Sequence, residues 1–208
     1  MAHAEPTSVQ FWTWFSSNAE RLRHDFADAK AANEIFPVVE RIRAELHRYD
    51  ERLFPLIGLD EDDRPELIIT AEGDAQAFLS VFELMKAAPK FDDWRIVPLK
   101  PRIGTCEGFR SIEVDGEELT LDDTRFVMSS NGTEVELAIL IDDYADEAED
   151  RFRYMALTLV ECLIGERDLA TRVNALDVIR LSDFKEAAGH EGWPIRELAT
   201  AIPPVTLH

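Results

Sequence analysis

Residues 66–104 constrain the fold of this chain more than any other stretch, because they combine a strand, a turn, a helix and a second strand. Residues 67–70 are a short apolar run rich in β-branched side chains, typical of a strand buried on both faces. The turn at residues 72–74 follows, and Asp74 suits the N-cap of a helix. Residues 94–97 return as a strand. The sequence therefore predicts one β-α-β crossover. The apolar residues of its helix recur at helical spacing: Phe78, Val81, Phe82 and Met85.

Two helices are predicted before this stretch. Thr7 and Gln10 have the spacing of a capping box at the start of the first helix. Pro37 fits the first turn of a second helix, since proline there loses no hydrogen bond. We expect the two helices to form an antiparallel pair, and residues 53–59 to form an irregular strand after them. The predicted core stripe of the first helix is Trp12, Phe15, Ala19, Leu22 and Phe26.

Short strands dominate after residue 104. Asp115-Gly116 and Asn131-Gly132 each separate two strand-like runs, which predicts two hairpins. A packing helix is predicted from Asp146 to Gly165, followed by a strand at residues 173–179 and a short helix at Pro194. The predicted packing side of the first of these helices is Phe152, Met155, Ala156, Leu159, Val160 and Leu163.

These elements predict an α+β fold: a largely antiparallel sheet with one β-α-β crossover and helices packed against it. No internal repeat or linker divides the 208 residues, so we expect one domain. Its parts are a helical N-terminal region at 7–50, a sheet-rich region at 53–180 and a packed C-terminal tail at 181–208.

The formal net charge of −20 limits the partners of this chain. An acidic surface repels nucleic acid and anionic lipid, and no basic run offsets it. A basic protein partner or a metal cation stays compatible with this charge, but a surface kept soluble by excess carboxylates explains it better than either. Cys106 and Cys162 are isolated, as in proteins of a reducing compartment. The N-terminus lacks the features of a signal peptide, and no apolar run approaches the roughly 20 residues of a spanning helix. We therefore expect a cytoplasmic protein.

Catalytic signatures are missing from the sequence. No nucleotide-binding, metalloprotease or serine-hydrolase motif occurs, and the five histidines are scattered. Asp142 and Asp143 follow a strand, but opening the next helix explains them better than a metal site does. Cys106 has no histidine near it in sequence. We therefore expect no metal and no cofactor, and the sequence gives enzymatic activity no support without excluding it.

One group of residues is a candidate ligand site. Trp14 and Asn18 share a face of the first helix, although an Arg21–Asp25 ion pair on that face is a structural alternative. Lys100 and Arg102 point the same way on an extended segment, where a carboxylate ligand would bridge them. Alternatively, Glu72 on the neighbouring strand would form ion pairs with these cations, with no ligand needed. The candidate ligand-binding residues are Trp14, Asn18, Glu72, Lys100 and Arg102.

Three stretches resemble a family of uncharacterised bacterial proteins, a domain of unknown function. They are residues 11–15 (FWTWF), the run that begins IITAEGDAQAF at Ile68, and Ile164-Gly165-Glu166. The resemblance implies a bacterial cytosolic protein with an α+β fold and says nothing about catalysis.

Three functional hypotheses follow. The first is a non-enzymatic protein-binding or interaction module that binds a basic protein, as an immunity protein binds and neutralises a basic toxin. The second is a small-molecule-binding protein or hydrolase, with a pocket between the first helix and the strand ends. The third is a homodimer that pairs through a sheet edge or through the aromatic first helix.

Overall fold

The computed structural model describes residues 7–32, 34–103, 109–132, 134–142 and 146–204, and its fold is α+β, as predicted. The chain divides into two compact units, Met1–Lys100 and Pro101–His208. The sequence analysis expected one domain. The boundary between the units falls between Pro98 and Pro101, in a stretch without the Gly- and Ser-rich composition of a flexible linker. Composition alone therefore did not mark it.

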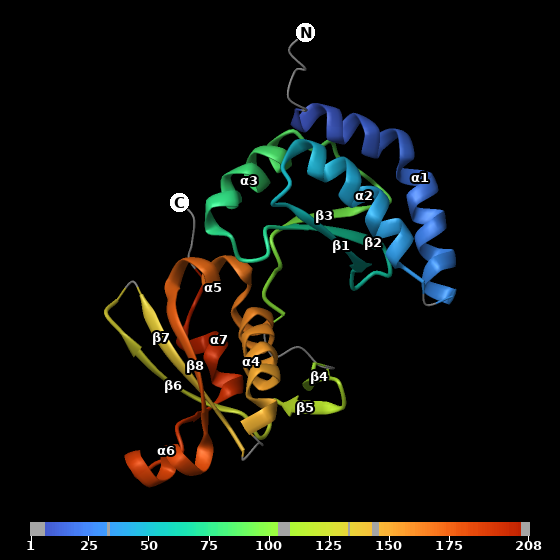
Figure 1. The fold of residues 1–208 in the computed structure, drawn as a ribbon. Coiled ribbons are helices and arrows are strands. Elements are labelled where there is room, and N and C mark those ends of the chain that lie inside the picture. Colours follow the sequence, from blue (N-terminus) through green and yellow to red (C-terminus); the bar gives the residue numbers. More distant parts are fainter. Residues whose placement is uncertain (1–6, 33, 104–108, 133, 143–145, 205–208) are drawn as a thin grey trace. The chain divides into compact units, whose positions relative to one another are not determined.

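The first unit begins with two helices that pack against each other, α1 (Ser8–Ala32) and α2 (Phe36–Tyr49) (Figure 1). The predicted capping box is confirmed. The backbone N–H of Thr7 donates to Gln10 Oε1 at 2.9 Å, and the N–H of Gln10 donates to Thr7 Oγ1 at 3.4 Å. Pro37 lies in the first turn of α2, also as predicted. The buried side of α2 consists of Val38, Ile42 and Leu46.

The sheet of the first unit has three strands, β1 (Phe54–Leu59), β2 (Pro65–Thr70) and β3 (Arg95–Pro98), in the order β1-β2-β3. β1 pairs with β2 antiparallel, and β3 pairs with β2 parallel. Helix α3 (Phe78–Lys86) connects the two parallel strands, which confirms the β-α-β crossover. β2 is the central strand, in agreement with its apolar composition.

The turn after β2 has the backbone geometry that its sequence indicates. Glu72 and Gly73 have φ angles of +50° and +84°, a left-handed conformation that glycine adopts without strain. Asp74 is an N-cap, since its side chain accepts a hydrogen bond of 2.9 Å from the N–H of Gln76. It opens a 3₁₀ turn, η1 (Ala75–Ala77), that leads directly into α3. Strand β2 thus passes into the crossover helix through a defined turn.

Aromatic side chains of α1 form much of the first unit's core. Phe15 is fully buried, and its ring packs edge-to-face on Phe91 at 5.2 Å and on Trp94 at 5.3 Å between centroids. Two tryptophan side chains donate hydrogen bonds to backbone carbonyl groups that are distant in sequence. Trp12 Nε1 donates to the carbonyl of Leu84 at 2.7 Å, and Trp94 Nε1 donates to the carbonyl of Ala19 at 3.1 Å. The buried residues of α1 are Phe11, Trp12, Phe15, Leu22 and Phe26.

The second unit contains two sheets. β4 (Ser111–Val114) and β5 (Glu117–Thr120) form an antiparallel hairpin, and both residues of its Asp115-Gly116 turn have positive φ angles. The other sheet has the order β8-β7-β6-β9. β6 (Arg125–Ser130) and β7 (Val135–Ile141) form the second predicted hairpin. At its edges lie β8 (Val173–Arg180) and β9 (Trp193–Pro194), the latter only two residues long.

Helix α4 (Glu149–Ile164) covers one face of this larger sheet, and all the residues predicted for its packing side are buried. It ends at Gly165, which has a φ of +81° and separates it from α5 (Glu166–Arg172). β8 then runs parallel to β7. The second unit therefore contains a β-α-β crossover that the sequence analysis did not predict. The C-terminal part adds α6 (Leu181–Ala188), the 3₁₀ turn η3 (Ile195–Glu197) and α7 (Leu198–Ala201).

Two details differ from the sequence-based expectations. The strands of the described residues form three separate sheets, where one largely antiparallel sheet was expected. Hydrophobic alternation predicts that a segment is a strand, but the choice of neighbour depends on tertiary packing. In addition, α4 follows a 3₁₀ turn, η2 (Asp146–Ala148), and its N-cap is Ala148 and not Asp146.

Candidate functional site

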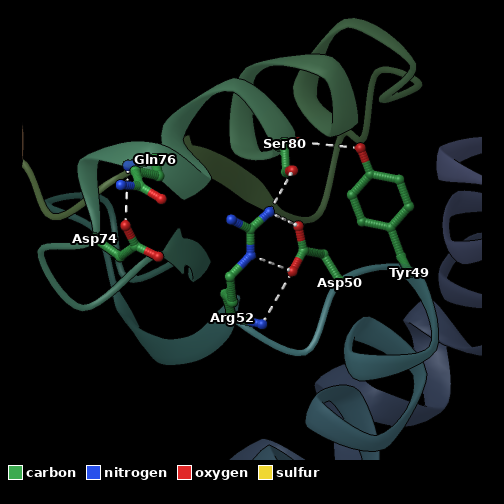
Figure 2. Close-up of polar contacts among 6 residues, drawn as sticks. All are labelled: Tyr49, Asp50, Arg52, Asp74, Gln76 and Ser80. Atoms are coloured by element: carbon green, nitrogen blue, oxygen red, sulfur yellow. Dashed lines mark hydrogen bonds and ion pairs between the residues drawn. The ribbon is translucent and has the colours of Figure 1, made fainter.

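A compact polar cluster joins the end of α2 to α3 in the first unit (Figure 2). Asp50 binds Arg52 through both carboxylate oxygens: Oδ1 accepts from Arg52 Nε at 3.0 Å, and Oδ2 accepts from Nη2 at 2.6 Å. The same Nη2 lies 3.4 Å from Ser80 Oγ on α3. Tyr49 donates its hydroxyl to the carbonyl of Ser80 at 3.2 Å. The bidentate Asp50–Arg52 ion pair thus lies within the loop after α2, and the contacts of Arg52 and Tyr49 with Ser80 join this loop to α3.

The protonation states of this cluster follow from its contacts. The hydrogen bond from Arg52 holds the pKa of Asp50 well below its usual range, and the Asp50 carboxylate raises the pKa of Arg52. Burial raises the pKa of Tyr49, and the negative charges of Glu83 and Asp50 raise it further. At neutral pH Asp50 has no proton to give, and Tyr49 keeps its own. The cluster is therefore suited to holding the loop.

Replacing Asp50 by Asn should lower the free energy of unfolding by about 1–2 kcal/mol at pH 7, because a charge-assisted, two-pronged bond is lost. The folded-state pKa of Asp50 is depressed, so its stabilisation is complete above the unfolded pKa of about 3.9 and is lost as the pH falls toward the folded pKa. Urea unfolding at pH 7, 5 and 3 should show an equal deficit of the Asp50→Asn variant at pH 7 and 5, and a smaller one at pH 3. Asp62→Asn, at an exposed carboxylate, is the control. A deficit that does not change with pH would contradict this account.

Trp14 and Asn18, the first two predicted ligand residues, lie one turn apart on α1. Asn18 Nδ2 donates to the carbonyl of Trp14 at 2.7 Å, and its Oδ1 accepts from Arg21 Nη2 at 2.7 Å. The expected Arg21–Asp25 pair is replaced by these contacts, since Asp25 accepts from Arg41 on α2 at 2.6 Å. A partner on the adjacent helix competes successfully for Asp25, and sequence spacing alone does not reveal it.

Trp14 also lines a hollow of about 220 Å³ between α1 and α2. None of the other four predicted ligand residues lines it. The residues around it are Thr7, Gln10, Phe11, Trp14, Glu45, Arg48 and Tyr49.

Glu72 and Lys100 are brought together as the sequence analysis allowed. Lys100 Nζ lies 3.0 Å from Glu72 Oε2, and the two residues sit where β2 and β3, which are parallel, both end. The sequence analysis gave an ion pair with Glu72 as the alternative to a bound ligand at Lys100, and this ion pair is present.

Arg102 falls in the second unit, and its guanidinium binds groups of the same unit. Nη2 donates to Asp168 Oδ2 at 2.7 Å and to the carbonyl of Ile202 at 2.6 Å, and Nη1 donates to the carbonyl of Ala199 at 3.1 Å. The side chains of Arg102 and Asp168 are only 21% and 8% exposed. Arg102 therefore fastens the C-terminal helix to α5. The five predicted residues thus lie as two pairs in the first unit and one arginine in the second, and no described hollow is lined by more than one of them.

Two grooves were not foreseen. In the first unit, a groove of about 570 Å³ lies between the second half of α1 and the start of α2, with an apolar floor of alanine, proline and valine. Three carboxylates line it beside a single cation: Asp25, Asp28, Glu34 and Arg41. Asp25 is paired with Arg41, and Asp28 lies 3.2 Å from the ring of His24. The groove is consequently acidic, in keeping with the charge of the whole chain.

The second groove lies in the second unit and has a volume of about 510 Å³. It opens between β6, β9 and α7. Its lining is apolar except for one carboxylate and one hydroxyl: Phe126, Met128, Trp193, Glu197, Thr200 and Ala201. Half of the Trp193 side chain is exposed there. The sequence analysis singled out none of these residues, and an isolated tryptophan in the C-terminal segment was the signal it passed over.

Other residues that the sequence analysis weighed give no further site. Asp143 and Cys106 lie outside the described residues, and Asp142 is exposed. Within the part of the chain that the structure describes, no three His, Cys, Asp or Glu side chains are grouped so that they would hold a metal ion. No helix among the described residues has the length and apolarity to cross a membrane. Comparison with models of known protein families and with curated proteins returned no match for this chain.

Proposed function

We propose that this chain is a non-enzymatic protein-binding module of the cytoplasm, and that it recognises a basic protein. One observation carries the proposal. The sequence contains 42 acidic residues and 22 Lys and Arg residues, so at least 42 − 22 = 20 carboxylates have no lysine or arginine of their own to pair with. Among the described residues, Glu66, Glu166 and Asp168 are buried and the Asp60 side chain is 3% exposed, so burial accounts for few of the excess carboxylates, which supports the proposal.

This charge has a physical consequence for recognition. Unpaired surface carboxylates repel one another, and a basic partner relieves that repulsion while it accelerates the encounter. The carboxylates that line the groove between α1 and α2 are an instance of this surface. The polar cluster at Asp50 has a structural explanation, because Asp50 is bonded to Arg52 and Tyr49 to the carbonyl of Ser80.

The alternative, a small-molecule-binding protein or hydrolase, has less support. Its predicted residues do not line a common hollow, and Arg102 and Lys100 each have an acidic partner inside their own unit.

A capture experiment tests the proposal. The purified chain is immobilised, exposed to native lysate at about 0.15 M salt and washed with increasing salt, because screening weakens contacts between exposed charges. We expect a basic protein to be retained and then released by salt, and an unrelated acidic bait of similar net charge to retain it less well. If no protein is retained while native mass spectrometry shows a co-purified small molecule, the alternative replaces this proposal.

A further inference from the structure

The outer edge of the larger sheet in the second unit is only partly covered. β9 pairs with β6 through two residues, Phe126 with Trp193 and Arg125 with Pro194. Gly192, just before β9, has a φ of +72°, and a side chain there would meet the carbonyl of Phe126 and the side chains of Leu140 and Val127. The backbone of Gly192 therefore lies close to β6 and β7, and pairing with β6 begins only at Trp193. Beyond Phe126, β6 has no further strand partner on this side among the described residues.

The hydrogen-bond pattern shows which backbone groups face this open edge. In an antiparallel pair, residues alternate between bonding to the partner and facing away from it. The N–H of Asn131 bonds to the carbonyl of Glu134, which makes Ser129 and Val127 the residues that bond to β7. The backbone N–H and carbonyl groups of the alternate residues point away from β7. These residues are Phe126, Met128 and Ser130. The carbonyl of Thr124 confirms this alternation, because it accepts from Ile195 beyond β9 at 3.1 Å. Met128 and Ser130 thus present their N–H and carbonyl groups at the open edge.

The apolar groove lies next to this edge. Phe126, Met128 and Trp193 supply an aromatic and thioether wall, and the Phe126 and Trp193 rings are 6.0 Å apart. Glu197 lies at its rim. Its carboxylate is exposed and makes no ion pair with any described residue. The groove therefore fits a side chain with a long apolar stem and a cationic end, which is an arginine or a lysine.

We propose that the open edge of β6 is the docking site for an extended segment of a basic protein, which adds a strand opposite Met128 and Ser130 and places one Arg or Lys side chain in the groove against Trp193 and Glu197. Strand addition supplies main-chain bonds, and the groove supplies side-chain selectivity. This inference rests on the proposed function and gives it a site.

The net charge of the chain favours a basic segment at this edge over a second copy of the chain. Two chains of net charge −20 repel each other, whereas a basic segment is attracted to the unpaired Glu197. The groove between α1 and α2 is less suitable, because Asp25 there already pairs with Arg41 and no strand edge adjoins it.

The test uses the full chain and a defined probe, an acetylated and amidated seven-residue peptide of alternating Thr and Val with a central Arg. A second peptide carries Glu in place of the Arg. The Arg peptide should bind at least about tenfold more tightly by calorimetry. Amide exchange gives an internal control. On binding, the amides of Met128 and Ser130 should become protected, while those of Val127 and Ser129, already bonded to β7, should not change.

Matched variants separate the edge from the groove. Ser130→Pro removes an outward N–H, and Ser130→Ala keeps it, although both lose the hydroxyl that accepts from Gly132. Glu197→Lys reverses the charge at the groove, and Glu136→Lys makes the same change at an exposed carboxylate of β7. Ser130→Pro and Glu197→Lys should each weaken binding about tenfold or more, and the two controls by less than about twofold.

The outcomes distinguish this inference from the function on which it rests. If a captured basic protein binds the Ser130→Pro and Glu197→Lys variants as tightly as the unchanged chain, the docking site is wrong and the proposed function stands. If the Arg and Glu peptides bind equally, the groove does not select a cation and the inference is overturned. A dimer in native mass spectrometry that Ser130→Pro abolishes would assign the edge to a second copy and would also overturn it.

Discussion

Replacing Arg102 by Met should destabilise the folded chain by about 3 kcal/mol, because it leaves a buried carboxylate without its charged partner. Methionine keeps most of the apolar stem but makes none of the bonds to Asp168, Ala199 and Ile202. The carboxylate of Asp168 is then left with Arg172, whose Nη1 is 4.0 Å from it. Urea-induced unfolding followed by circular dichroism measures the change.

Arg196→Met is the matched control. Arg196 pairs with Asp122 at 2.7 Å, but this pair is exposed, with the Asp122 side chain 72% accessible. Its loss should cost at most about 1 kcal/mol. The comparison also decides between two roles for Arg102. If Arg102→Met unfolds at the same urea concentration as the unchanged chain, the arginine is not a structural fastener, and a ligand role for it returns.

Replacing Phe15 by Ala should destabilise the first unit by about 3–5 kcal/mol, the range typical of a large aromatic removed from a packed core. Its ring is fully buried and contacts those of five other aromatic residues: Phe11, Trp12, Trp14, Phe91 and Trp94. The structure around a cavity of this size relaxes only in part. Urea unfolding followed by tryptophan fluorescence reports the change directly, since Trp12 and Trp94 are in contact with the missing ring.

Phe36→Ala removes the same side chain from a position that is 71% exposed, at the start of α2. We expect its effect to stay within about 0.5 kcal/mol. A Phe15→Ala variant that loses less than about 1 kcal/mol would show that the aromatic cluster is not the core that its contacts indicate.

The two large effects together also test how the chain unfolds. Phe15 and Arg102 lie in different compact units. If the chain behaves as the single domain that its sequence predicted, both substitutions move one common unfolding transition. Two transitions, each moved by one substitution only, would show that the units unfold independently.

Much of the secondary structure could be predicted because its causes are local. The capping box at Thr7, the turn at Gly73 and the hairpin turn at Asp115-Gly116 each depend on a few neighbouring residues, and each is present. The apolar face of α4 was predicted equally well, because helical spacing places its residues on one side whatever they pack against.

The ligand residues could not be predicted in the same way. Asp25 pairs with Arg41 across two helices, and Arg102 binds carbonyl groups about 100 positions away in the sequence. Such partners depend on how the elements pack, and no spacing rule gives them. The edge of β6 is a further case, because β9 pairs with only two of its residues, and the length of that pairing depends on how the C-terminal segment packs.

The sequence by itself determined the α+β class, the net negative charge and the positions of most helices and strands, since composition, hydrophobic periodicity and turn chemistry do not depend on tertiary contacts. Only the tertiary structure decided which strands became neighbours, where the chain divides into units and which charged side chains were already paired. These features depend on contacts between residues far apart in the chain, and their energies are set by burial and geometry that no local pattern contains.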